Sequence, residues 1–455
     1  MNQTFFDYYR CPEKFADFLS VGKPAEGAGF FRFGPEAVCY GRSSHGPLSG
    51  EPAGNLSDAF DAVTIGQSFA GLPFDLTEVV ENLRREQYFR DQKPSLRRKW
   101  TERILRNSYY LVRPFLPVRV RRYAQRARLR GWDRIPFPRW PVDHAVDSLM
   151  ETCMRLALQV NGVKEIPFVW FWPEGAPSCA VMTHDVETTA GRDFCSTLMN
   201  INDSYGIKSS FQVVPEKRYQ VPPQYLESLR RRGFEINVQD LNHDGHLYRE
   251  REEFLRRVEK INRYGRAYGA KGFRAGVLYR RIDWYDSFDF EYDMSVPSVA
   301  HLDPQRGGCC TVMPFFIGKI LEIPVTTTQD YSLFHIFGEY SLELWEKQVS
   351  LIMSKYGLIN FIVHPDYLLS RRAQATYREL LSYLDRLRSE GKIWLVLPGE
   401  VNTWWRNRSQ MKLVPHKESW RIEGPGSERA RLAFARLEEE RIVYRVEPSS
   451  KAASA

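Results

Sequence analysis

From residue 178 to about 405, short apolar runs alternate with segments whose apolar residues recur at helical spacing. Runs such as "SCAVMTHDV", "FEINVQD" and "LINFIVHPDYL" predict strands, and "DFCSTLMNINDSYG" and "TYRELLSYLDRLRSEG" predict helices. About seven such repeats predict an α/β fold with a mostly parallel sheet, and a distorted (β/α) barrel fits this count better than a doubly wound sheet. In barrels the chemistry gathers at the carboxyl ends of the strands.

The rest of the chain has a different pattern and predicts smaller units around the barrel. Residues 1–60 are rich in Gly, Pro and Ser, and "FFRF" and "EAVCYG" predict a small β region. We expect a basic helical region over 61–140, a linker and packing helix over 141–177, and the barrel over 178–405. Residues 406–455 predict a small appendage in which the helix-like "SERARLAFARLEEE" precedes the strand-like "RIVYRV", followed by a disordered tail.

The positive charge of the chain is concentrated in one segment. The chain of 455 residues carries a net charge of +8, yet residues 93–140 alone contain fifteen Lys and Arg against Glu102 and Asp133. Interleaved aromatic and apolar residues suit helices that lie on an anionic membrane surface, and a solvated basic face packed on the main domain is the alternative. No base-reading motif accompanies the charge, so we expect no nucleic acid as partner.

The start of the sequence lacks the pattern of a secretory signal, and no apolar stretch approaches the roughly 18 residues that a spanning helix needs. We therefore expect a cytoplasmic protein, peripheral at the inner face of the membrane if the basic segment binds there. The seven cysteines are scattered and form no Cys-x-x-Cys pair, which argues against a disulfide framework or a structural zinc site.

Polar side chains fall at successive predicted strand ends. Asp185 and Glu187 follow the first strand, His243 follows the third, Arg274 lies in the fourth, and His364 lies at the end of "LINFIV". Carboxylates and imidazoles suit Zn²⁺ or a similar divalent metal, which lowers the pKa of a bound water. A free carboxylate would then act as base and a second histidine as acid.

The segments "THDVE", "EINVQDLNHDG", "FRAGVLY" and "FIVHPDY" occur in the order of the motifs of the polysaccharide deacetylase (NodB-homology) family, which the chain resembles over about 178–400. The resemblance implies a hydrolase that removes N-acetyl groups from a polysaccharide or glycan precursor, with a divalent metal, zinc being expected, and a carbohydrate substrate. It implies Asp185 as base, Glu187 as metal ligand, Arg274 as the residue that orients the base, and His364 as acid.

The sequence departs from the family at the metal motif, His-x3-His. Gln239 occupies the place of the first histidine and His243 that of the second, so an amide oxygen would have to coordinate the metal. His246 and His184 are secondary candidates for the missing ligand. Asp293 in "YDMS" and Asp366 in "VHPDY" are further secondary candidates, and Gly276 stands where the family usually has proline.

The sequence leaves two other functions open. A barrel that has lost catalysis and binds carbohydrate or a polysaccharide-assembly partner would explain Gln239. A relative that hydrolyses another linear or cyclic amide would use the same motifs. The presence of the expected base, acid and arginine favours the deacetylase, because a binding protein has no need of proton-transfer residues.

Overall fold

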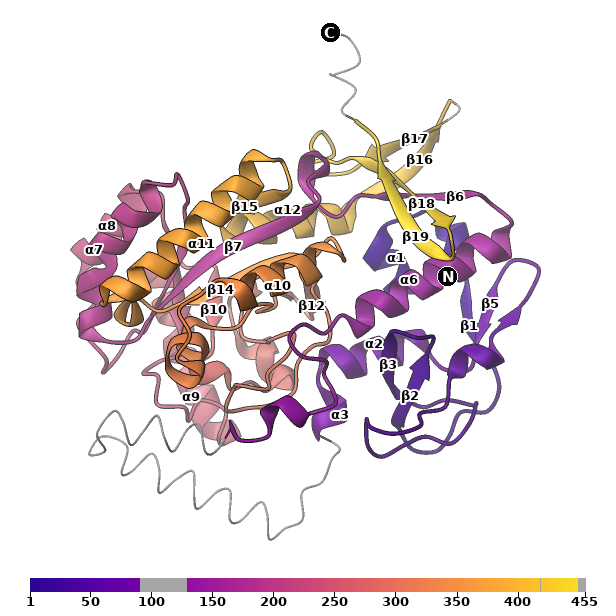
Figure 1. The fold of residues 1–455 in the computed structure, drawn as a ribbon, viewed down its shortest axis with the longest axis horizontal. Helices are drawn as coiled ribbons and strands as arrows, with labels where there is room; N and C mark the ends of the chain where they lie inside the picture. Colours follow the sequence, from indigo (N-terminus) through magenta and orange to yellow (C-terminus); the bar gives the residue numbers. More distant parts are fainter. Residues whose placement is uncertain (91–128, 418, 449–455) are drawn as a thin grey trace.

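The computed structural model describes residues 1–90, 129–417 and 419–448. A curled sheet with helices on its outer face forms one side of the molecule, and the N-terminal region with α6 (Ala145–Asn161) forms the other (Figure 1). Residues 91–128, which include most of the basic segment, lie outside the described residues. The predicted membrane contact of 93–140 therefore falls largely outside them as well.

The main sheet has nine strands in the order β12-β13-β11-β10-β9-β8-β7-β14, with β15 also paired to β7. All its pairs are parallel except β12 with β13. Its strands are β7 (Ser178–Val186), β8 (Ser210–Val213), β9 (Glu235–Gln239), β10 (Gly272–Arg274), β11 (Tyr292–Asp293), β12 (Phe315–Ile317), β13 (Ile320–Glu322), β14 (Leu358–Val363) and β15 (Ile393–Val396). The predicted α/β class and barrel-like sheet are confirmed; β11 and β12 raise the strand count above seven because they are too short to give a periodic pattern.

Helices α7 to α12 pack around this sheet (Figure 1). They are α7 (Thr189–Asp203), α8 (Pro223–Arg231), α9 (Arg251–Tyr268), α10 (Glu343–Met353), α11 (Arg371–Ser389) and α12 (Pro398–Gln410). Local signals fix several ends: the side chains of Thr188 and Ser370 cap α7 and α11, and α9 ends at Gly269 in the left-handed conformation. The strand–helix alternation thus places the carboxyl ends of the parallel strands at one edge of the sheet.

The curled sheet does not close by backbone pairing among the described residues. Instead, the chain that follows β13 is joined to β14 by side chains. Thr326 Oγ1 donates to Leu358 O at 2.8 Å and accepts from Asn360 N at 2.9 Å. Thr327 Oγ1 donates to Asn360 O at 2.9 Å. These hydroxyls satisfy backbone groups of β14 that a further strand would otherwise pair.

The N-terminal region shares one hydrophobic core with α6 and the nearest part of the main sheet. Its elements are α1 (Gln3–Tyr9), β1 (Phe18–Ser20), β2 (Gly29–Phe33), β3 (Ala37–Gly41), β4 (Thr64–Ile65), β5 (Ala70–Leu72), α2 (Leu76–Arg84) and α3 (Gln87–Arg90). A buried ion pair of Glu86 with Arg280 also joins this region to the loops of the barrel. The N-terminal region therefore packs against the barrel instead of hanging from a linker.

The C-terminal residues form β structure. β16 (Lys412–His416) pairs with β17 (Ser419–Glu423), while β18 (Leu432–Glu438) pairs with β19 (Arg441–Val446) and with β6 (Glu165–Val169). The prediction of a helix-like stretch at 427–440 is wrong, because β6 supplies a partner strand from some 260 residues earlier and pairing overrides local helix propensity. β6 also shows that 141–177 contains more than a linker and a helix.

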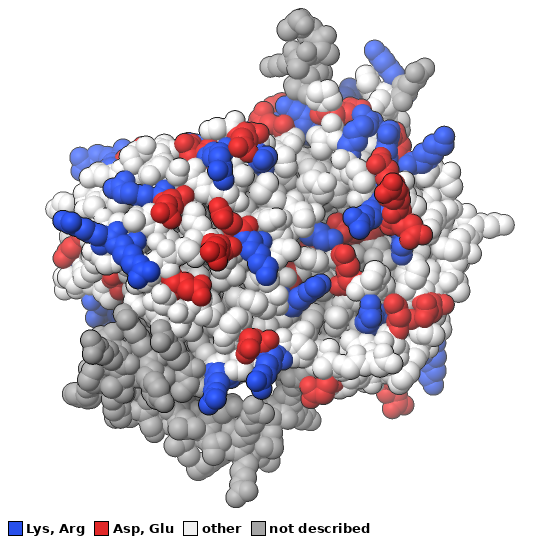
Figure 2. Space-filling model, in the orientation of Figure 1, with Lys and Arg blue, Asp and Glu red and all other residues white. Residues whose placement is uncertain are grey.

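On the face shown in Figure 2, Lys and Arg alternate with Asp and Glu, without a large area of one sign. Surface ion pairs such as Arg232 with Asp203 account for part of this mixing. No helix in the described part of the chain is long and apolar enough to cross a membrane.

Candidate active site

Four strand ends bring the predicted site residues together. β7 carries Asp185 and leads into Glu187, β9 ends at Gln239, β10 ends at Arg274, and β14 leads into His364. In the sheet β14 is paired with β7 and β9 with β10, with β8 between the two pairs, and Arg274 is in register with Gln239. The parallel sheet therefore brings together residues that are far apart in the sequence, such as Glu187 and His364.

Asp185 is a buried carboxylate held by two strands. Its Oδ1 accepts from Arg274 Nη1 at 2.6 Å, and its Oδ2 accepts from Gln239 Nε2 at 3.0 Å. Arg274 is itself fixed, because its Nη1 donates to Thr183 Oγ1 at 2.8 Å and its Nε donates to Met294 O at 2.9 Å. The ion pair is almost free of solvent contact, so the fold sets its geometry.

Glu187 is the point on which the imidazoles converge. Its Oε1 lies 2.7 Å from His243 Nε2 and 3.5 Å from His364 Nε2. It also accepts from Gln239 Nε2 at 3.3 Å. Burial acts to raise the pKa of Glu187, but the two histidines outweigh it and hold that pKa well below its usual value. The Glu187 carboxylate is therefore ionised, and its oxygens are available as ligands for a metal ion.

Asp330 completes the site and was not predicted from the sequence. Its Oδ1 lies 2.7 Å from His364 Nδ1, and its Oδ2 accepts from the backbone N of His364 at 2.8 Å. Burial acts to lower the pKa of His364, but Asp330 and Glu187 outweigh it and raise that pKa well above its usual value. The signal that could have found Asp330 is its place directly after the extended run "ILEIPVTTTQ". We call Asp185, Glu187, His243, Arg274, Asp330 and His364 the charged centre.

His243 stands on a tight turn after β9, where both Asp240 and His243 have positive φ, 52° in each case. Gly276 lies against this turn: a Cβ there would meet Asp240 Oδ2 at 2.5 Å and His243 Cδ2 at 3.1 Å. A proline at this position would bring the same Cβ and displace the turn. Burial acts to lower the pKa of His243, but Glu187 outweighs it and raises that pKa.

The secondary candidates make their own contacts outside the ligand set of Asp185, Glu187 and His364. His184 points to the opposite face of β7, where Asn202 and Tyr377 surround it. His246 Nδ1 lies 3.8 Å from Asp244 Oδ2. Asp293 pairs with Ser295 and stands in register with Glu322. Asp366 lies against Gly191 at the start of α7, and burial raises its pKa to about 6.

The donor set fits a divalent metal ion. Among the described residues, Asp185, Glu187 and His364 offer ligand atoms that all lie within 4.8 Å of one another, and His243 approaches Glu187. Carboxylate and imidazole are donors that Zn²⁺ takes in proteins. Gln239 turns its amide nitrogen towards both carboxylates, and its buried Oε1 has no hydrogen-bond partner in the described part of the chain. A turned amide would present that oxygen to a cation instead.

Comparisons with known proteins give structural likeness only. No family model and no curated protein matches the sequence. A protein from Mycobacterium smegmatis assigned to the polysaccharide deacetylases is 15% identical, with 55% of this chain and 98% of that chain covered and a TM-score of 0.43. A protein from Pseudomonas aeruginosa PAO1 with the same assignment is 13% identical, with 52% and 93% covered and a TM-score of 0.40.

PuuE allantoinase is 11% identical, with 52% of this chain and 92% of that chain covered and a TM-score of 0.41. The chain is thus similar to solved polysaccharide deacetylases. The likeness covers about half of the chain at low identity.

Proposed function

We propose that this protein is a metal-dependent hydrolase that removes N-acetyl groups from a polysaccharide or glycan precursor. The observation that carries the proposal is the charged centre, in which a carboxylate fixed by an arginine lies beside a carboxylate approached by two histidines. Such an arrangement places a proton acceptor and a metal-binding group side by side and gives each carboxylate a different role. The proposed reaction class is hydrolysis of a carbon–nitrogen bond outside peptides.

Asp185 acts as the general base in this proposal. Arg274 and Gln239 hold its two oxygens, so the carboxyl group is directed before substrate arrives. A divalent ion, with zinc expected, would be held by Glu187 and His243 with the amide oxygen of Gln239, and when bound it supplies Lewis-acid activation of water and of the acyl oxygen. Asp185 takes a proton from the attacking water.

His364 acts as the general acid. Asp330 binds its Nδ1 side, which leaves Nε2 turned towards Glu187 and the substrate. The raised pKa keeps the imidazole protonated near neutral pH, as an acid requires. Water adds its oxygen to the acyl carbon, the carbon–nitrogen bond breaks, and His364 protonates the amine as acetate leaves.

One contact favours a second function. Gln239 Nε2 donates to both Asp185 and Glu187. These hydrogen bonds fill the space between the two carboxylates, where a bound cation would otherwise lie and neutralise their charge. A barrel that keeps this arrangement permanently would bind carbohydrate or a polysaccharide-assembly partner without catalysis. The orientation of the Gln239 amide therefore separates the two functions.

Metal content and acetate release test the proposal together. The purified protein should hold a divalent metal, lose it in His243→Ala, and bind it more tightly in Gln239→His. Acetate release from N-acetylated oligosaccharides should follow the metal. A wild-type protein without metal, combined with gain of metal in Gln239→His, would establish the non-catalytic alternative.

The cellular location of the protein is part of the proposal. A cytoplasmic location, peripheral at the inner face of the membrane, rests on the basic segment 93–140 and would suit a lipid-linked glycan precursor as substrate. Flotation with anionic liposomes at low salt and release at high salt would support it. Equal flotation with neutral liposomes would count against an electrostatic contact.

A further inference from the structure

The chain between β10 and Arg280 has an unfavourable backbone conformation. We call residues 275–280 the strained loop, because Val277 and Leu278 within it have positive φ, 60° and 52°. Residues other than glycine rarely adopt this conformation, and for a β-branched valine it is an outlier. Such a conformation costs free energy and persists only where the surrounding structure holds it. Contacts from outside the strained loop therefore have to keep it in place.

The strained loop supports the turn that carries His243. Gly276 is packed so closely against this turn that a Cβ there would meet Asp240 Oδ2 at 2.5 Å and His243 Cδ2 at 3.1 Å. Asp240 and His243 have positive φ as well, so the turn also depends on its neighbours. A shift of Gly276 would therefore free the turn that places the His243 imidazole beside Glu187.

Arg280 closes the strained loop at its far end. The side chain is 2% exposed, and its Nη1 donates to Leu278 O at 2.9 Å. The backbone N of Arg280 donates to Gln305 Oε1 at 3.0 Å, and its carbonyl accepts from Gln305 Nε2 at 3.2 Å. The guanidinium thus reaches back to a residue with positive φ and holds its carbonyl.

Glu86 of the N-terminal region holds Arg280 in turn. It lies between α2 and α3 and is 1% exposed. Its Oε2 accepts from Arg280 Nε at 2.8 Å, and its Oε1 pairs with Arg280 Nη2. Oε1 also accepts from Gly308 N at 2.7 Å. A bidentate pair of this kind fixes the direction of the guanidinium as well as neutralising its charge.

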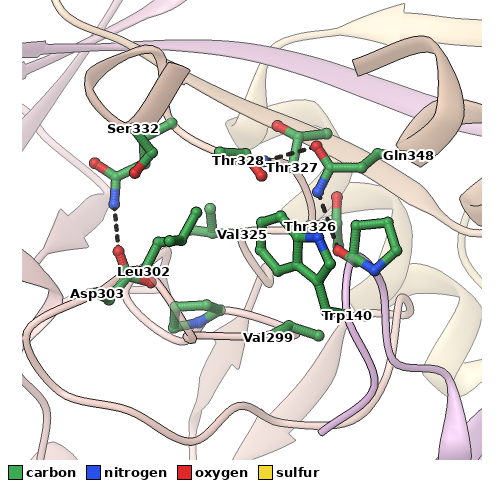
Figure 3. A pocket seen from close by; sticks show the side chains of 13 residues that line it. Trp140, Val299, Leu302, Asp303, Val325, Thr326, Thr327, Thr328, Ser332 and Gln348 are labelled. Atoms are coloured by element: carbon green, nitrogen blue, oxygen red, sulfur yellow. Dashed lines mark hydrogen bonds between the residues drawn. The ribbon is translucent and has the colours of Figure 1, made fainter. Parts of the chain in front are cut away.

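The loop 303–308 encloses the ion pair from the side of the barrel. Gln329 Nε2 donates to Asp303 Oδ1 at 2.9 Å, a contact drawn in Figure 3, and so ties this loop to the chain that precedes Asp330. Gly307 has a φ of 115° and lies so close to Glu86 that a Cβ there would meet Oε1 at 2.5 Å. Glu86 is therefore held between the N-terminal region and a fixed loop of the barrel.

We propose that Glu86 is a positioning residue of the charged centre, because through Arg280 it holds the strained loop against the His243 turn. The N-terminal region is then needed for the site, although it contributes no residue to the charged centre. The proposal deepens the proposed function and rests on it in one respect, that His243 is a metal ligand. The placement of the His243 turn can be measured without metal.

Hydrogen exchange of the metal-free full chain, followed by mass spectrometry, tests this placement. Glu86→Gln keeps the shape of the side chain and removes its charge, so amides of 240–246 should exchange about tenfold faster. Arg280→Lys keeps an ion pair with Glu86 but loses the donor to Leu278 O, and it should act in the same direction if Glu86→Gln does not fold. Peptides from α7 should exchange as in the wild type, which excludes a general loss of structure.

The matched control is a second ion pair that involves a largely buried cation. Lys355 Nζ lies 2.6 Å from Glu151 Oε2 on α6, and neither residue contacts the strained loop in any described hydrogen bond or ion pair. Glu151→Gln also removes the charge of a carboxylate beside a cation. Exchange in 240–246 should nevertheless stay at the wild-type rate.

Val277→Gly separates positioning from stability. Glycine adopts positive φ without steric cost, so the loop would no longer depend on the hydrogen bond from Arg280. Added to Arg280→Lys, it should return exchange in 240–246 to within about twofold of the wild type. A merely structural role of Arg280 predicts no such rescue, because the glycine replaces none of the lost contacts.

Titration with Co²⁺, followed by its visible absorption, tests the consequence for metal binding. The Kd should rise about tenfold in Glu86→Gln and recover when Val277→Gly is added. Unchanged exchange in 240–246 in both Glu86→Gln and Arg280→Lys would overturn the proposal, as would faster exchange with unchanged Co²⁺ affinity. A wild-type protein that binds no Co²⁺ would contradict the proposed function instead, and the exchange rates would still show whether Glu86 holds the His243 turn.

Discussion

Two buried histidines lie at the ends of neighbouring strands and have opposite protonation states. His184 on β7 is in register with the residue that precedes His364 on β14, and both side chains are less than one-tenth exposed. Burial lowers the pKa of His184 to about 3. Burial acts in the same direction on His364, but Asp330 and Glu187 reverse it. The difference teaches that a carboxylate neighbour, and not depth, decides which imidazole is charged.

His184 belongs to a neutral network on the outer face of β7, made of His184, Asn202, Ser209 and Tyr377. Its Nδ1 lies 3.1 Å from Val363 O and its Nε2 lies 3.1 Å from Asn202 Nδ2. A neutral ring with its proton on Nδ1 satisfies both contacts. Strand alternation thus separates this network from the charged centre, although His184 and Asp185 are adjacent in sequence.

The largest expected effect comes from removing the base. Asp185→Asn keeps a hydrogen-bond acceptor for Arg274 but cannot take a proton, so kcat for acetate release should fall about 10⁴-fold. Metal content should stay at the wild-type level. Asp193→Asn, an exposed carboxylate on α7, is the matched control and should keep full activity. Substantial turnover by Asp185→Asn would place the base elsewhere.

Stability should depend on the arginine of the charged centre. Arg274→Met leaves Asp185 buried beside Gln239 without a cation, which should lower the free energy of unfolding by about 3–5 kcal/mol. Adding Asp185→Asn should restore part of the loss. Arg232→Met breaks a surface pair with Asp203 and should cost about 1 kcal/mol or less. Equal losses in urea unfolding for the buried and surface pairs would contradict the distinction.

Asp330 tests whether a carboxylate charges His364. Asp330→Asn should lower the pKa of His364, so the alkaline limb of the pH–kcat profile should move to lower pH. We expect kcat to fall about 10- to 100-fold because the imidazole loses its fixed orientation. Asp193→Asn, the exposed carboxylate on α7, is the control and should leave the limb in place. An unmoved limb in Asp330→Asn would remove the proposed cause.

Local patterns in the sequence were sufficient for the buried strands and for the residues attached to them. β7 and β14 are long apolar runs, so Asp185 and His364 could be placed at strand ends. Asp330 and β18 required partners from far along the chain. The contact of Asp330 with His364 spans 34 positions, and β18 is fixed by β6. Such pairings depend on tertiary packing, which single-sequence periodicity does not encode.

The smallest expected effect is the pH dependence contributed by the neutral network. The native pKa of His184 is about 3, whereas an unfolded histidine titrates near 6.5. Below pH 6.5 the unfolded chain therefore binds a proton that the native chain does not, and stability falls as the pH falls towards 3.

His184→Gln removes this group while keeping an amide for the network. Between pH 6 and pH 5 the wild-type protein should lose about 1 kcal/mol more unfolding free energy than the variant, as measured by urea unfolding at both pH values. His364 is common to both proteins, so its opposite contribution cancels from the difference. His416→Gln, on exposed β16, should leave the wild-type slope unchanged. Parallel slopes for the wild type and His184→Gln would mean that His184 accepts a proton in the native state, and the contrast between the two histidines would then fail.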